Sequence, residues 1–146
     1  MLARLAMLVA YDGTDYRGWT DVRDSVLRPT VAKVLRCDVA QPPLIEAASR
    51  TDAGVHAVGQ VCSLPLPASP DGQVLDVGQV AYSLNQLLPA QVAIRSCAVV
   101  GDEFDVRANI EKTYAYEFST SPCRNPLTRL HAWHVPRRRG RPAWDE

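Results

Sequence analysis

The sequence predicts an α+β domain, built as a ferredoxin-like, or RRM-like, antiparallel sheet with two helices on one face. Two kinds of segment predict it: short runs with the apolar pattern of strands, and two amphipathic runs with helical spacing. Their order along the chain is strand, helix, strand, strand, helix, strand and strand, which is the split pattern of that fold. The second face of such a sheet needs a cover, which RNA, a partner subunit or a second similar domain could provide.

Five segments are predicted as strands, and they span residues 3–11, 44–48, 59–66, 91–100 and 112–120. The first is short and apolar and ends at the turn signal "DGTDYRG". In the last, Tyr114, Tyr116 and Phe118 alternate with other residues, so a strand would place all three on one face.

Two segments are predicted as helices. Residues 28–39 carry Val31, Val34 and Leu35 at helical spacing, with Pro29 acceptable in the first turn. Residues 76–88 form an apolar stripe, with Asp76 as the expected N-cap and Pro89 as the stop; the stripe consists of Val77, Val80, Ala81, Leu84, Leu87 and Leu88.

The charge pattern is neutral overall but uneven. The 146 residues carry no net charge, so no overall field draws the chain to polyanions. Fourteen of the sixteen cationic residues are arginine, whose planar fork suits phosphate. No acidic residue lies between Glu117 and Asp145, a stretch that holds six arginines. This basic end is as typical of a nucleic-acid-facing segment as of a solvated tail.

The cysteines and the N-terminus indicate a soluble intracellular, cytoplasmic protein, although composition does not separate the cytoplasm from the nucleus or an organelle. The four cysteines are far apart and form no CxxC pair, which argues against a disulfide scaffold. The apolar run "LAMLVA" is far too short for a membrane span. His131 and His134, with Cys123 nearby, are weak grounds for a metal site, so we expect no metal.

The stretch "SRTDAGVHAVG", residues 49–59, is unusually dense in charged, hydroxyl and imidazole side chains. Gly54 relaxes the loop after a strand, so the Asp52 carboxylate can point into a cleft. An oriented carboxylate with no second acid nearby suits nucleophile or base work. By charge and spacing alone, an Arg50–Asp52 pair that pins the loop is the more common explanation.

The string "RTDAGVHA" resembles the signature loop of the TruA-type tRNA pseudouridine synthases. Three further motifs follow the family's order: "YDGTDYRGW" after the first strand, "NQLLPAQVAIR", and "FDVRANIEKTYAYEF". Together these motifs extend from the first strand to Phe118.

The resemblance implies an isomerase that converts selected tRNA uridines, typically in the anticodon arm, to pseudouridine without cofactor or metal. It implies that Asp52 is the nucleophile, that Arg50 contacts the RNA and helps to hold the displaced base, and that Tyr114 stacks on the target uracil. Thr51, His56 and Arg107 complete the expected substrate-binding set. His56 is expected to close the loop through hydrogen bonds, and Arg107 either contacts RNA phosphates or is an ordinary surface arginine. Extruding a base costs a few kcal/mol, and stacking recovers on the order of 1–3 kcal/mol.

The chain departs from the family pattern in places. Ser49, Thr20 and Gln91 replace the expected Gly, Gln and Asp, and the spacing from Arg107 to Tyr114 is one residue short. Family members carry a second, pseudo-symmetric half and form homodimers. We therefore expect residues 1–146 to be the N-terminal half of a catalytic domain, with 121–146 a basic, loop-rich passage toward the second half.

The alternative function is a non-catalytic RNA-binding module on the same sheet. RNA-recognition modules stack bases on an aromatic-rich strand motif, "K/R-G-F/Y-G/A-F-V-x-F/Y". The chain contains no such string, which disfavours this alternative.

Overall fold

The computed structural model describes residues 3–66 and 75–136 and divides into two units, residues 1–109 and residues 110–146. The basic run at residues 137–141 and the turn-rich loop at 67–73 lie outside the described residues. Within the described ranges, no helix has the length and apolar character needed to span a bilayer.

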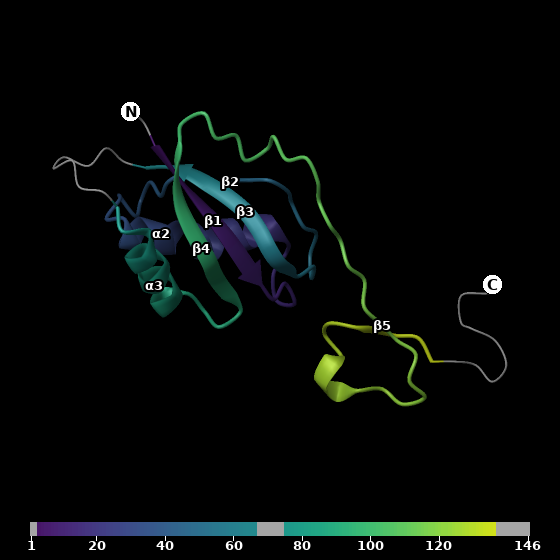
Figure 1. The fold of residues 1–146 in the computed structure, drawn as a ribbon. Coiled ribbons are helices and arrows are strands. Elements are labelled where there is room, and N and C mark those ends of the chain that lie inside the picture. Colours follow the sequence, from purple (N-terminus) through teal and green to yellow (C-terminus); the bar gives the residue numbers. More distant parts are fainter. Residues whose placement is uncertain (1–2, 67–74, 137–146) are drawn as a thin grey trace. The chain divides into compact units, whose positions relative to one another are not determined.

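The first unit is built on a four-stranded antiparallel sheet in the order β2-β3-β1-β4 (Figure 1). The strands are β1 (Ala3–Tyr11), β2 (Glu46–Ala47), β3 (Ala57–Pro65) and β4 (Val92–Gly101). The predicted α+β class and the antiparallel sheet are thus confirmed, with β2 shorter than expected. The central strand β1 pairs with both β3 and β4.

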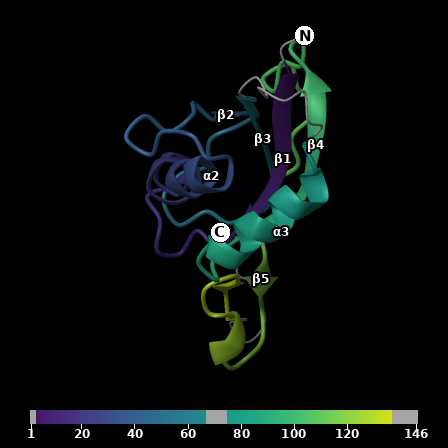
Figure 2. The same ribbon diagram turned by 90° about the vertical axis from the view of Figure 1, so that its left-hand side faces the viewer.

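The helices cover one face of this sheet, as Figure 2 shows for α2 and α3. They are α1 (Trp19–Asp21), the π-helical η1 (Val22–Leu27), α2 (Arg28–Val34) and α3 (Val77–Leu87). On β1, every second residue from Leu5 to Tyr11 is buried toward the helices, as period-2 alternation predicts. The core formed there also includes Trp19, Val31 and Leu84.

The first helical region differs from the prediction. It begins at Trp19 rather than near Arg28 and ends at Val34, so Pro29 lies inside a longer helix instead of in a first turn. A proline in a helix interior removes one hydrogen bond and crowds the preceding turn. Here the π-helical segment η1 comes directly before it, and the Arg28 N–H bonds the Arg23 carbonyl five residues back.

The second helix follows the prediction closely. The Asp76 side chain accepts a hydrogen bond of 3.0 Å from the Gln79 N–H, which confirms the N-cap. Val80 and Leu84 are buried and the rest of the stripe packs on the core, except for Leu87, which is exposed.

The predicted fifth strand at residues 112–120 is wrong for most of its length. Residues 110–117 form neither helix nor strand, and all are exposed. Only β5 (Phe118–Ser119) is a strand, and it pairs in parallel with β6 (Trp133–His134) inside the second unit. That unit also contains the short η2 (Pro126–Thr128) and a Phe118–Trp133 ring contact with centroids 5.7 Å apart.

Candidate active site and arginine pocket

The signature loop, residues 48–56, connects β2 to β3 and is held by the turn that follows β1, residues 12–18. The Trp19 N–H donates to the Thr51 carbonyl at 3.1 Å, and the Gly54 N–H donates to the Tyr16 carbonyl at 3.1 Å. A side chain on Gly18 would overlap the Thr51 carbonyl oxygen. The two segments therefore pack backbone to backbone, which fixes the path of the loop around Asp52.

Side chains add two further links between these segments. The Tyr11 hydroxyl and the Thr51 hydroxyl lie 2.8 Å apart. Burial is the main cause that raises the pKa of Tyr11 above its ordinary value, so the phenol stays protonated and can donate to Thr51. The Thr51 side chain, predicted to bind substrate, is therefore hydrogen-bonded to a core residue of its own unit.

His56 forms the second link. Its Nδ1 atom lies 3.1 Å from the Gly13 backbone nitrogen, from which it accepts a hydrogen bond, and 3.0 Å from Oδ1 of Asp12. When Nδ1 carries a proton it can donate to Asp12, and when it does not it can accept from Gly13. The expectation that His56 closes the loop through hydrogen bonds is confirmed.

Asp52 occupies the exposed tip of this loop. Its backbone carbonyl accepts a hydrogen bond from Val55 at 3.2 Å, which closes a tight turn. Its carboxylate makes no hydrogen bond or ion pair within residues 3–66 and 75–136. The loop-pinning pair with Arg50 does not form, so backbone contacts hold the loop and leave both side chains available.

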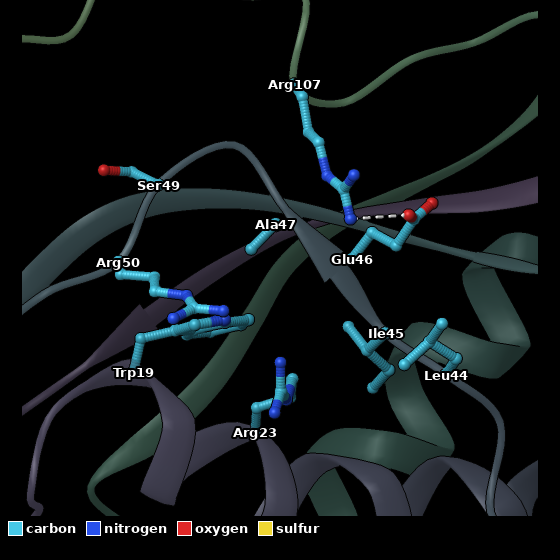
Figure 3. A pocket seen from close by; sticks show the side chains of 9 residues that line it. All are labelled: Trp19, Arg23, Leu44, Ile45, Glu46, Ala47, Ser49, Arg50 and Arg107. Carbon is cyan, nitrogen blue, oxygen red and sulfur yellow. Dashed lines mark hydrogen bonds and ion pairs between the residues drawn. The ribbon is translucent and has the colours of Figure 1, made fainter.

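Arg50 and Arg107 lie together at a pocket of about 110 Å³ in the first unit (Figure 3). It is lined by Trp19, Arg23, Leu44, Ile45, Glu46, Ala47, Ser49, Arg50 and Arg107. Arg107 reaches it from the segment after β4 and donates to Oε1 of Glu46 at 2.9 Å. Asp52 does not line this pocket.

Trp19 and Arg23 line the pocket, although neither was predicted from the sequence to be a site residue. Trp19 is a packing residue, only 1% exposed, and it also lines the pocket. Arg23 belongs to η1, outside the four motifs, and no pattern in the sequence separated it from the other arginines. Only the helix that starts at Trp19 brings it to the pocket.

Tyr114 belongs to the second unit, on the exposed segment before β5. Its side chain is 64% exposed, and the strand that was expected to carry it does not form. A stacking role for Tyr114 stays a prediction.

Comparison with known proteins identifies the family. A family model described as tRNA pseudouridine synthase matches residues 7–107. Similar proteins named tRNA pseudouridine synthase A include one from Syntrophotalea carbinolica, 34% identical over 131 residues, and one from Methylacidiphilum infernorum, 37% identical over 136 residues. These alignments cover 88% and 90% of this chain, respectively, and 50% of each relative.

A third relative with the same name, from Thermosynechococcus vestitus, is 35% identical over 133 residues, which are 90% of this chain and 45% of that protein. The chain thus spans about half the length of the curated relatives it matches. The family match covers the turn after β1, the signature loop and the segment that carries Arg107. The chain belongs to the tRNA pseudouridine synthase family.

Proposed function

We propose that the protein containing this chain is a tRNA pseudouridine synthase in which Asp52 is the nucleophile. The observation that carries the proposal is that the Asp52 carboxylate, within the described part of the chain, is exposed and unpaired on a loop that is held in place. Its carboxylate is exposed and makes no hydrogen bond or ion pair among the described residues, while hydrogen bonds from Trp19 and to Tyr16 fix the loop beneath it. A nucleophile needs free lone pairs and a fixed position, and this arrangement supplies both.

The reaction is an isomerisation. The Asp52 carboxylate forms a covalent bond to the uridine nucleotide, the glycosidic C–N bond breaks, and the uracil rotates. A C–C bond then forms between C1′ of the sugar and C5 of the base, and the bond to Asp52 breaks, which regenerates the free carboxylate. The C5 hydrogen leaves as a proton and the freed N1 gains one, so atoms and charge balance without an external oxidant or reductant. The proposal therefore includes no cofactor and no metal.

The RNA-facing roles follow from position and chemistry. Arg50 is a guanidinium without a hydrogen bond or ion pair among the described residues, and it is two positions from Asp52. Such a group can contact phosphate and fill the space left by an extruded base. Arg107, Thr51, His56 and Tyr114 are proposed as the remaining substrate-binding residues, and a uridine of the anticodon stem-loop is proposed as the target.

The proposed assembly is an intracellular homodimer acting on tRNA, with residues 1–146 as the N-terminal half of the catalytic domain. The coverage of about half of each relative supports a second half elsewhere in the full-length protein. Residues 121–146 are proposed as the passage toward it.

The test is tritium release from tRNA labelled with [5-³H]uridine, with the full-length protein. Pseudouridine formation releases tritium to water because the bond from C5 to tritium is replaced by a bond from C5 to the sugar. The proposal therefore predicts tritium release that depends on protein concentration. Binding of the tRNA without any release would instead favour the non-catalytic RNA-binding module.

A further inference from the structure

The pocket below Arg50 has the size of a site for a small anion. Its volume of about 110 Å³ is well below the roughly 300–1,000 Å³ of pockets that enclose drug-sized ligands. A single phosphate group is of a size that suits this space. Asp52 is not among the residues that line the pocket. The pocket is therefore distinct from the Asp52 carboxylate, where we propose that the uridine reacts.

The charge of the pocket favours an anion because, among the described residues, its lining holds three arginines and one carboxylate, that of Glu46. Glu46 accepts hydrogen bonds from both Arg4 and Arg107, at 2.6 and 2.9 Å. Both carboxylate oxygens of Glu46 thus pair with other arginines, and Glu46 forms no ion pair with Arg50.

Asp24, beside the pocket, is engaged in the same way. It accepts hydrogen bonds from Nε of Arg23 at 2.9 Å, from Nη2 of Arg23 at 2.8 Å and from Arg28 at 3.4 Å. Within the described residues, Nη1 of Arg23 makes no hydrogen bond and can donate to a ligand. The arginines around the pocket therefore outnumber the carboxylates, and within the described residues Arg50 is the member with no hydrogen bond or ion pair.

The geometry brings three guanidinium groups to one opening. In Figure 3, Arg107 points down from the segment after β4, and Arg23 and Arg50 reach the same opening from η1 and from the signature loop. Trp19, which is buried in the core, also lines this opening. Arginine forks are suited to charge-assisted, bidentate contacts with phosphate oxygens.

We propose that this pocket binds one phosphodiester group of the RNA backbone, with Arg23, Arg50 and Arg107 as its donors. The inference rests on the proposed function, which supplies RNA as the substrate, and it adds a phosphate site and one residue, Arg23. A phosphate held here fixes the RNA beside the signature loop, so that the backbone contact positions the strand while Asp52 reacts with the nucleotide.

The inference is tested by measuring the affinity of the full-length protein for an unmodified tRNA transcript across a series of salt concentrations. Arg23→Gln removes one donor while keeping a polar side chain of similar length. Lys33→Gln is the matched control, because Lys33 is an exposed cation of the same helical region that does not line the pocket. Both variants lose one positive charge.

The expected result is a Kd for tRNA on the order of tenfold weaker for Arg23→Gln, and a salt slope, d log K/d log [salt], shallower by about one. Lys33→Gln is expected to keep the wild-type slope. Equal slopes for Arg23→Gln and the wild type, or equal losses for Arg23→Gln and Lys33→Gln, would overturn the inference. If Arg23→Gln does not fold, Arg107→Gln is judged by the same criteria.

Failure of the inference can be told from failure of the proposed function. Binding and its salt slope can be measured whether or not pseudouridine forms. A wild-type protein that binds tRNA but releases no tritium contradicts the function and leaves the phosphate site to be judged on the slopes alone.

Discussion

The backbone N–H of Trp19 donates a hydrogen bond to the carbonyl oxygen of Thr51, at 3.1 Å, and thereby joins the start of the first helix to the residue before Asp52. Gly18 makes this approach possible. It has φ +87° and ψ −173°, a conformation that L side chains rarely adopt, and a Cβ there would overlap the Thr51 carbonyl oxygen. The turn after β1 and the signature loop therefore behave as one structural unit.

Gly18→Ala is expected to lower the free energy of unfolding by more than Gly54→Ala, measured by urea denaturation. Both glycines have positive φ, which costs a side chain on the order of 1–3 kcal/mol. Only Gly18 adds an overlap with backbone, whereas a Cβ on Gly54 would meet nothing within 4 Å. Equal losses in the two variants would contradict the close packing of Gly18 on Thr51.

His56→Ala is expected to lower the free energy of unfolding by about 1 kcal/mol, because it removes the acceptor for the Gly13 N–H. His56→Asn places an amide oxygen close to the position of Nδ1 and is expected to recover most of that loss. Turnover separates the two roles of His56. If the side chain only holds the loop, His56→Asn recovers kcat/KM together with stability, whereas a substrate-binding role leaves kcat/KM low.

Asn85 in α3 joins the helix to β4. Its side-chain amide donates to the Ile94 carbonyl at 2.9 Å and accepts from the Ile94 N–H at 2.8 Å, which satisfies the outer edge of an edge strand. Asn85→Ala is expected to cost about 1–2 kcal/mol of unfolding free energy. The neighbouring exposed Gln86→Ala serves as the control and is expected to stay within about 0.5 kcal/mol of the wild type. A loss no larger than that of Gln86→Ala would contradict a stabilising role for the Asn85 bridge.

Strands and helices that bury one face were predictable from the sequence. A short apolar run that ends at a turn signal predicted β1, alternating residues predicted β4, and the apolar stripe with its Asp76 cap predicted α3. The segment from Trp19 to Leu27 was missed because charged residues interrupt its apolar positions, and because Pro29 is compatible with the first turn of a helix that begins at Arg28. Its helical state depends on packing Trp19, Val22 and Leu27 into the core, which a local pattern does not reveal.

The fifth strand shows the opposite error. Tyr114, Tyr116 and Phe118 alternate as in a strand, yet all three are exposed, and within the described part of the chain residues 110–117 pair with no strand. Alternation predicts a strand only where a partner satisfies the backbone N–H and C=O groups.

The loop motif located Asp52 and Arg50, but not their environment. Their lack of mutual pairing, the link from His56 to the first turn and the pocket at Arg23 depend on segments distant in sequence.

The two thiols on the helix-facing side of the sheet predict a pH dependence of stability. Burial raises the pKa of Cys62 from 9.0 to about 12 and that of Cys97 to about 11. Below pH 9 both thiols are protonated in the native and unfolded states. Above it the unfolded chain loses these protons first, so the free energy of unfolding falls as the pH rises, by at most about 1.4 kcal/mol per pH unit for Cys62.

The free energy of unfolding is measured by denaturation at several pH values between about 9 and 11. In this range the thiols of the unfolded chain lose their protons before those of the native state. Cys62→Ala is expected to flatten the fall, and Cys123→Ala, at an exposed thiol, is the control. An equally steep fall in Cys62→Ala would show that the buried thiol is not its source.

The central claim is that Asp52 reacts with the uridine, and its most direct test is single-turnover tritium release by Asp52→Ala in the full-length protein. The Asp52 carboxylate is exposed and has no hydrogen bond or ion pair among the described residues. The free energy of unfolding of the variant is therefore expected to lie within about 0.5 kcal/mol of the wild-type value. The variant is also expected to bind tRNA with wild-type affinity. Tritium release is expected to fall to background. Release at the wild-type rate by folded Asp52→Ala would contradict the assignment of Asp52 as the nucleophile.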